Sequence, residues 1–311
     1  EYGNLTTTVY VPPVTELQKT LCAVLCKLFE VEQFSIEDDF FDMGGDSLRA
    51  IEYTAAAHEE GIDFSLQRVF DYPTVKSLCE YLERGEKDTV TYDAKDFERY
   101  NSVLKNNIED EDFKPLKTSL GNVLLTGATG FLGAHILDQL MQLETGKIYC
   151  LVRNSDKTSA YQKLKHILNH YFGELYDKDL GKRILVITGN IEKENLSEQM
   201  PTDIQTVIHT AASVKHYGSY DYFDRVNAKG TAHVVAFAKR MHAKLIHIST
   251  LSVSGNSMAD EFSVYRSAEE KHFSETSFFI DQPLDNVYIH SKFEAERAVY
   301  DAMLEGLDAK V

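Results

Sequence analysis

The chain lacks the features that mark secreted, membrane-spanning and zinc-binding proteins. Its 311 residues include four cysteines, too few and too scattered for a disulfide framework, so reduced thiols in a cytoplasmic protein are expected. Cys22 and Cys26 lie four residues apart, but no second Cys or His pair stands at the spacing of a zinc site, and no metal is expected. No apolar run approaches a membrane span and no signal peptide opens the sequence, so no membrane partner is expected.

Positive charge is also scarce. The formal net charge is −17, which argues against nucleic acid or an anionic membrane as a partner. Residues 1–90 contain 18 Asp plus Glu and 7 Lys plus Arg, so this part has a net charge of −11. A small acidic domain suits docking onto basic patches of other proteins, although a merely well-solvated domain would have the same composition.

Length and hydrophobic pattern predict two domains joined by a linker. Residues 10–85 are expected to form a small four-helix bundle, with helices at 15–30, 47–60, 66–70 and 73–82. Residues 86–118 are polar, contain one weakly helical stretch at 94–104, and are expected to be the linker. Residues 119–311 alternate buried strands with helices, the pattern of a doubly wound α/β domain with a parallel sheet. The strands are expected at 123–126, 148–152, 184–188, 206–209 and 244–249.

The segment 39–48 reads Asp-Phe-Phe-Asp-Met-Gly-Gly-Asp-Ser-Leu. Its two glycines allow a tight turn that displays Ser47 at the start of a helix, with Leu48 expected to anchor that helix to the bundle. Two alternatives are a plain helix N-cap and a lipase-like hydrolase motif. The hydrolase would need a strand before the serine and a later Asp-x-x-His, and none of the eleven histidines follows an Asp at that spacing.

This segment resembles the phosphopantetheine attachment motif of carrier domains in nonribosomal peptide synthetases. The resemblance implies that Ser47 is esterified by 4′-phosphopantetheine, whose thiol carries an acyl chain as a thioester. A phosphodiester at a helix N-terminus is also electrostatically well placed.

The second domain opens with Thr-Gly-Ala-Thr-Gly-Phe-Leu-Gly at 126–133, between a predicted strand and a predicted helix. Glycines at this spacing let the backbone approach a pyrophosphate at a helix N-terminus. The loop resembles the dinucleotide loop of extended short-chain dehydrogenases. The cofactor contacts that it predicts come from Gly127, Thr129, Gly130, Phe131, Leu132 and Gly133.

Further cofactor contacts follow in the order of that superfamily. The second strand ends at Arg153, where an NAD enzyme would place an acid, so NADPH is predicted as the cofactor. Lys163 adds charge there or is a solvated helix lysine. After the third strand, Gly189-Asn190 stands where the family usually has Gly-Asp against adenine, so that contact is expected to be altered. Asn190 and the following Ile191 are both predicted cofactor contacts. Ala211 lies in the loop after the fourth strand.

Three residues form the predicted catalytic set. Thr250 follows the fifth strand, and Tyr288 and Lys292 form a Tyr-x-x-x-Lys pair, which places both side chains on one helical face. Such a pair by itself is also typical of a surface helix. In this ordered set it resembles the catalytic pair of extended short-chain dehydrogenases, with Thr250 and Tyr288 on the reacting carbonyl and Lys292 near the phenol and the nicotinamide ribose.

A carrier directly before such a dehydrogenase resembles the terminal thioester reductases of nonribosomal peptide synthetases. Aminoadipate and carboxylic acid reductases share this arrangement. The resemblance implies that NADPH reduces an acyl or peptidyl thioester and releases an aldehyde, or an alcohol after a second reduction. It implies as partners a phosphopantetheinyl transferase and the adenylation and condensation domains of one synthetase. The alternatives are a non-catalytic docking module with a degenerate reductase scaffold, and a sugar-nucleotide epimerase or dehydrogenase, which Arg153 and the carrier disfavour.

The sequence departs from this pattern in three places. Thirty-seven residues separate Thr250 from Tyr288, which is long for the superfamily and predicts an insertion near the substrate. Only 19 residues follow Lys292, so the last strand of the sheet and the C-terminal substrate lobe are expected to be missing. The stretch 10–13, Tyr-Val-Pro-Pro, looks like the end of a linker from an adenylation domain. The chain is therefore expected to be a segment of a longer protein.

Overall fold

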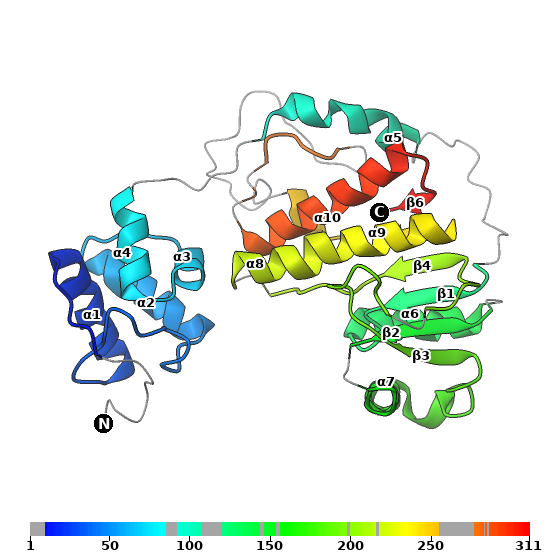
Figure 1. Cartoon of the computed structure of the whole chain (residues 1–311), viewed down its shortest axis with the longest axis horizontal. Coiled ribbons are helices and arrows are strands. Elements are labelled where there is room, and N and C mark those ends of the chain that lie inside the picture. Colours follow the sequence, from blue (N-terminus) through cyan, green and yellow to red (C-terminus); the bar gives the residue numbers. More distant parts are fainter. Residues whose placement is uncertain are drawn as a thin grey trace. The chain divides into compact units, whose positions relative to one another are not determined.

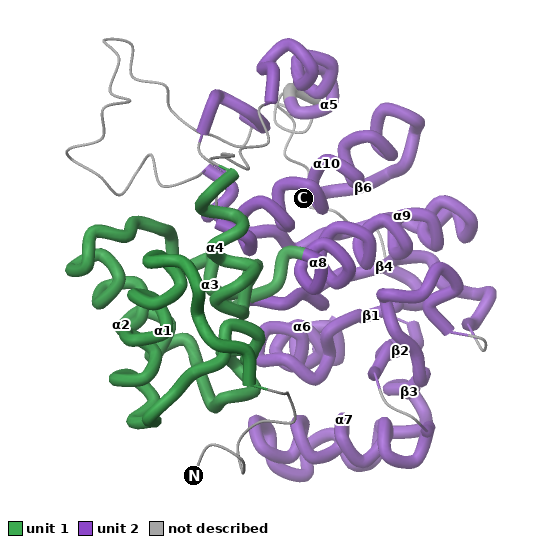
Figure 2. The backbone as a smooth tube through the Cα atoms, turned by 60° about the vertical axis from the view of Figure 1, so that its left-hand side comes forward, with its two compact units in different colours: residues 1–90, 215–220 green, residues 91–214, 221–311 purple. Residues whose placement is uncertain are grey.

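The structure is a computed structural model of the whole chain. It describes residues 10–84, 92–106, 120–143, 146–153, 156–197, 200–215, 218–254, 277–282, 284 and 286–311. The chain divides into two compact units (Figure 2), residues 1–90 with 215–220, and residues 91–214 with 221–311. Each unit is described by itself.

The first unit is a bundle of four helices (Figure 1), as predicted: α1 (Glu16–Phe29), α2 (Ser47–Glu59), α3 (Leu66–Asp71) and α4 (Val75–Arg84). A capping box opens α1, because the Thr15 side chain accepts from the backbone of Gln18 and the Gln18 side chain accepts from the backbone of Thr15. Leu21, Phe40 and Leu78 are fully buried between the helices. A continuous apolar core of this kind holds short helices that would not be stable alone.

The second unit contains a parallel six-stranded sheet of order β3-β2-β1-β4-β5-β6. In its centre Leu125 of β1 lies opposite Cys150 of β2 and Ile208 of β4. The doubly wound fold is thereby confirmed, with five strands at the predicted places. The strands are β1 (Val123–Thr126), β2 (Ile148–Val152), β3 (Ile184–Thr188), β4 (Thr206–His209), β5 (Lys244–His247) and β6 (Ala309–Lys310).

The expectation that the last strand is missing is wrong. Ala309 and Lys310 form β6, which pairs in parallel with Leu245 and Ile246 of β5. Two residues suffice because the strand extends a sheet that is already formed. None of the described helices combines the length and the apolar character that crossing a bilayer requires.

Helices cover both faces of the sheet (Figure 1). On one face α6 (Phe131–Gln142) and α7 (Lys157–Phe172) contribute to one buried apolar cluster, and on the other α9 (Gly230–Met241) and α10 (Val287–Leu304) contribute to another. The chain reverses its direction of travel along the sheet between β1 and β4, and ligands of such sheets bind outside the carboxyl ends of the strands at this point. Other short elements of the described chain are η3 (Gly173–Tyr176), α8 (Tyr220–Phe223), η4 (Asp224–Lys229) and η5 (Leu251–Ser254).

Part of the interval interpreted as a linker packs against the second unit. Residues 94–106 form η2 (Ala94–Tyr100) and α5 (Asn101–Asn106). Phe97, Tyr100 and Leu104 are buried in one cluster with Phe278 and with Phe293 of α10. Although residues 86–118 are polar on average, three of them are core residues, so the segment 92–106 belongs with the second unit and is not a linker. The remainder of that interval lies outside the described residues.

We expect Phe97→Ala to destabilise the second unit by about 3–5 kcal/mol, the usual cost of removing a buried phenyl ring. Phe97 is only 5% exposed and contacts the rings of Phe278 and Phe293. Chemical denaturation followed by circular dichroism would measure the free energy of unfolding. The control is Glu98→Ala on the exposed side of the same helix, which should change stability by less than about 0.5 kcal/mol. Equal effects of both changes would contradict the packing of this segment.

Candidate active site and carrier serine

Ser47 is exposed at the first position of α2. The cap of this helix is Asp46, whose Oδ1 accepts from the backbone N–H of Arg49 at 2.9 Å, so the Ser47 hydroxyl is not the N-cap. The turn before it requires glycine: Gly44 has a φ of +89°, and a Cβ on Gly45 would lie 2.3 Å from the Phe40 ring. The turn therefore presents the hydroxyl to solvent.

The expected anchoring role of Leu48 is wrong. Its side chain is 65% exposed, while Ala50, Tyr53 and Ala57 are the buried residues of α2. With about 3.6 residues per helical turn, these three residues lie on the opposite side of α2 from Leu48, so Leu48 faces solvent. The residues directly before Ser47 form turns and no strand. The hydrolase alternative requires a strand at this place, so its structural requirement is not met.

A cavity of about 280 Å³ lies at the carboxyl ends of β1, β2, β3 and β4. It brings together seven of the predicted cofactor residues: Gly127, Thr129, Gly130, Arg153, Asn190, Ile191 and Ala211. Lys163 of α7 also lines it. Phe131, Leu132 and Gly133 form the first turn of α6 instead, and Lys292 lies away from the cavity lining.

At the glycine loop the cavity is lined by backbone atoms, because side chains would not fit there. Gly127 has a φ of +77°, and a Cβ there would lie 2.4 Å from Thr210 Oγ1. A Cβ on Gly133 would lie 2.1 Å from the carbonyl oxygen of Gly127. Gly130 is the N-cap of α6 and also lines the cavity, so the N-terminal end of this helix, where backbone N–H groups have no partner within the helix, lies beside the cavity. These features fit the pyrophosphate of a dinucleotide.

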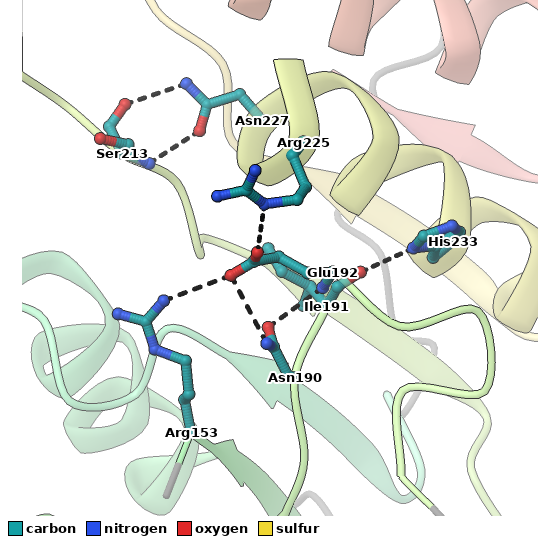
Figure 3. A network of polar contacts seen from close by, with 8 residues as sticks. All are labelled: Arg153, Asn190, Ile191, Glu192, Ser213, Arg225, Asn227 and His233. Atoms are coloured by element: carbon teal, nitrogen blue, oxygen red, sulfur yellow. Dashed lines mark hydrogen bonds and ion pairs between the residues drawn. The ribbon is translucent and has the colours of Figure 1, made fainter. Parts of the chain in front are cut away.

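A carboxylate between two guanidinium groups lies at the Arg153 end of the cavity (Figure 3). Glu192 accepts from Arg225 Nε at 2.7 Å and lies 3.4 Å from Arg153 Nη1. The hydrogen bond from Arg225 holds the pKa of Glu192 below its usual value, although partial burial acts in the opposite direction. The side chain of Asn190 also contacts Glu192, at 3.4 Å.

Helix α10, which contains the predicted pair Tyr288 and Lys292, contacts the segment that follows β5. Asn286 caps it by accepting from the backbone N–H groups of Tyr288 and Ile289 at 2.9 and 3.2 Å. One turn later, Lys292 Nζ donates to the carbonyl oxygen of Ile248 at 2.9 Å. Thr250 follows Ile248 by two residues. The segment after β5 that contains Thr250 therefore approaches α10. Most of the 37 residues between Thr250 and Tyr288 lie outside the described part of the chain.

Burial dominates the electrostatics around Lys292. Removal from water lowers the pKa of Lys292 to about 8, and the nearby Glu296 opposes that shift. Burial raises the pKa of Glu296 to about 7, against the Ser249 hydroxyl and the Lys292 charge. His247 Nε2 lies 3.3 Å from Lys292 Nζ, and burial followed by the lysine charge lowers the pKa of His247 well below its usual value. His247 is thus neutral and can accept from the ammonium group.

Several buried polar residues at this site were missed by sequence reasoning. Asn227 is 1% exposed and bonds both backbone groups of Ser213 and the Ser291 hydroxyl, at 2.7–2.9 Å. It lies in η4, a π-helical segment of the kind often found at functional sites, which the helical period of the sequence does not reveal. Glu296 could have been found, because it stands four residues after Lys292 on the same helical face.

These features define the class: a carrier domain followed by a dinucleotide-binding domain with the residue order of a short-chain dehydrogenase. The chain belongs to the family described as Male sterility protein, which matches residues 125–311. Residues 17–82 match the family described as Phosphopantetheine attachment site. The two predicted classes of cofactor, a phosphopantetheine group and a nicotinamide dinucleotide, are thereby confirmed.

Known proteins are similar to this sequence over most of its length. The sequence is 27% identical to a subunit of the linear gramicidin synthase of Brevibacillus parabrevis, over 97% of this chain and 6% of that protein. The structure of a thiolation-reductase di-domain from an archaeal non-ribosomal peptide synthetase matches with a TM-score of 0.79 and 36% identity, over 97% of this chain and 64% of that one. The Aureusimine biosynthetic cluster reductase domain matches with a TM-score of 0.58 and 31% identity, over 70% and 56% of the two chains. The chain thus spans only part of each relative.

Proposed function

We propose that the first unit carries an acyl or peptidyl group as a thioester on phosphopantetheine at Ser47, and that the second unit reduces this thioester with NADPH. The product is an aldehyde. The strongest support is that one chain contains both an exposed serine at a helix start and a cavity lined by a glycine loop. At the end of the fifth strand of the same sheet lies the buried helix with the Tyr-x-x-x-Lys pair.

Reduction of a thioester to an aldehyde takes up one hydride and one proton and releases a thiol. When bound, NADPH supplies the hydride. Tyr288 supplies the proton to the carbonyl oxygen, and Thr250 donates a second hydrogen bond to it. The thiohemiacetal that results then breaks its C–S bond, and its hydroxyl proton passes to the departing sulfur, which leaves the arm as a free thiol. Lys292, as a cation, favours the ionised phenol during proton transfer and holds the nicotinamide ribose.

The remaining predicted residues bind the cofactor. Backbone groups of 127–133 hold the pyrophosphate, and the guanidinium of Arg153 binds the 2′-phosphate. Asn190 and Ile191 contact adenine, and Ala211 lies against the cofactor from the β4 side. The tether at Ser47 replaces a bimolecular encounter by a high local substrate concentration.

We place the carrier at residues 10–85 and the reductase at 119–311, with 92–106 as an added support of the reductase. A phosphopantetheinyl transferase attaches the arm, and adenylation and condensation domains of the same synthetase supply the acyl group in the cytoplasm. The deciding experiment is to load the carrier with a synthetic acyl-pantetheine arm, add NADPH, and identify the product by mass. An aldehyde supports the proposal, whereas recovery of the intact thioester supports a non-catalytic docking module.

We expect Ser47→Ala to abolish attachment of the arm completely, since Ser47 supplies the exposed hydroxyl that directly follows the glycine turn. A broad-specificity transferase with coenzyme A, followed by intact-protein mass measurement, should add one arm to the unmodified protein and none to the variant. Ser65→Ala is the matched control, because Ser65 is also exposed at a helix start and makes no capping hydrogen bond. Modification that persists in Ser47→Ala would refute the carrier assignment.

A further inference from the structure

The Arg153 end of the cavity contains an acid that the cofactor prediction did not include. Glu192 lines the cavity two residues after Asn190. In dinucleotide sites an acid near the adenosine ribose selects NAD by accepting from the ribose hydroxyls, whereas an arginine accommodates the 2′-phosphate of NADP. This cavity holds both kinds of residue, so its preference depends on the charge that Glu192 presents.

The contacts of Glu192 are unequal. Its bond from Arg225 Nε is 2.7 Å long, whereas Arg153 Nη1 lies 3.4 Å away. The Glu192 side chain is 17% exposed, while those of Arg225 and Arg153 are 52% and 63% exposed. The carboxylate is therefore held mainly by Arg225, and the exposed contact with Arg153 is easily broken.

Arg225 is held in turn by its surroundings. It lies at the second position of η4, and its guanidinium carbon stands 5.7 Å from the ring centre of Tyr222, a residue that also lines the cavity. Asn190 holds Glu192 from the other side: the backbone N–H of Glu192 donates to Asn190 Oδ1 at 3.0 Å (Figure 3). Glu192 and Arg225 thus form a well-held ion pair, whereas the neighbouring Arg153 is more exposed and contacts Glu192 only at 3.4 Å.

We propose that Arg225 is a specificity-determining residue that acts through Glu192. By neutralising this carboxylate it allows a 2′-phosphate to bind Arg153 without repulsion. Without Arg225, the charge of Glu192 would repel the 2′-phosphate and draw Arg153 to itself, but it would not disturb a ribose that has a free 2′-hydroxyl. The inference rests on the proposed use of NADPH and assigns its selectivity to a residue outside the cavity lining.

The test measures the dissociation constants of NADPH and NADH by calorimetry with this chain. Arg225→Met should weaken NADPH binding by about tenfold, the size expected for one unscreened charge several ångströms away. NADH binding should stay within about twofold, because it lacks the 2′-phosphate. Adding Glu192→Gln to Arg225→Met should restore NADPH binding to within about threefold of the unmodified protein, since the repelling charge is gone.

Arg240→Met is the matched control, because Arg240 lies in the last turn of α9 and makes no contact with Glu192 among the described residues. It should leave both constants unchanged. Equal weakening of NADPH and NADH by Arg225→Met would show a merely structural role and overturn the inference. Failure of Glu192→Gln to restore NADPH binding would overturn it as well. If the unmodified protein binds neither nucleotide, the proposed function itself fails.

Discussion

Tyr288→Phe should lower the rate of aldehyde release by about 10²–10⁴-fold, the range attributed to general acid catalysis. In the proposed mechanism the phenol acts only on the reacting carbonyl, so the dissociation constant of NADPH should stay within about twofold. Tyr288 is 9% exposed and packs with Phe223, Val287 and Ile289, and phenylalanine fills the same space. Single-turnover reduction of a loaded carrier would give the rate, in the longest available form of the protein.

Thr250 provides the comparison for this result. Thr250→Ala removes one of two hydrogen bonds to the carbonyl oxygen and leaves the proton donor, so its loss should be smaller than that of Tyr288→Phe. Its Oγ1 also accepts from the backbone N–H of Ser252 at 3.2 Å, so Thr250→Ser, which keeps the hydroxyl, separates this local role from catalysis. If Thr250 proved essential and Tyr288 dispensable, the resemblance would describe the fold and not the chemistry.

Strands and turns that depend on local sequence were predictable. Four of the five predicted strands have the bounds given by their apolar runs, because buried parallel strands are apolar on both faces. The glycine turns before α2 and α6 were predictable because a left-handed backbone or a close approach admits no side chain, as at Gly127 and Gly45. The cofactor cavity follows from the order of the strands.

Features that depend on distant partners were not predictable. Glu192 and Arg225 are 33 residues apart, and Lys292 contacts the carbonyl of Ile248 across 44 residues. Residues 309 and 310 carry no strand signal of their own and are ordered by pairing with β5. Phe97 lies among charged residues, and its burial depends largely on the distant aromatic side chains of α10 and of residues 278–279. Such contacts can be predicted only after the fold is known.

The reduction rate at low substrate should fall as the pH rises through about 8, because Lys292 then loses its proton. Its pKa is lowered to about 8 by burial, so the lysine is a cation below that pH and neutral above it. In the proposed mechanism the cation is the form that favours the ionised phenol and binds the ribose. Since kcat/KM reports the free enzyme, its pH profile should show this alkaline limb. Lys292→Met should remove the activity and also weaken NADPH binding, unlike Tyr288→Phe.

Glu296 allows the titrating group to be identified. Its pKa is raised to about 7, so near pH 8 it is mostly ionised, and its negative charge raises the pKa of Lys292. Glu296→Gln removes that charge without changing the size of the side chain, so the alkaline limb should move to lower pH. Glu294→Gln is the matched control on the same helix, because Glu294 contacts Tyr92 and Arg297. A limb at the same pH in Glu296→Gln and in the unmodified enzyme would show that a group other than Lys292 titrates. In that case, Lys292 would not lose its proton near pH 8, and its charge could not be the cause of the alkaline limb.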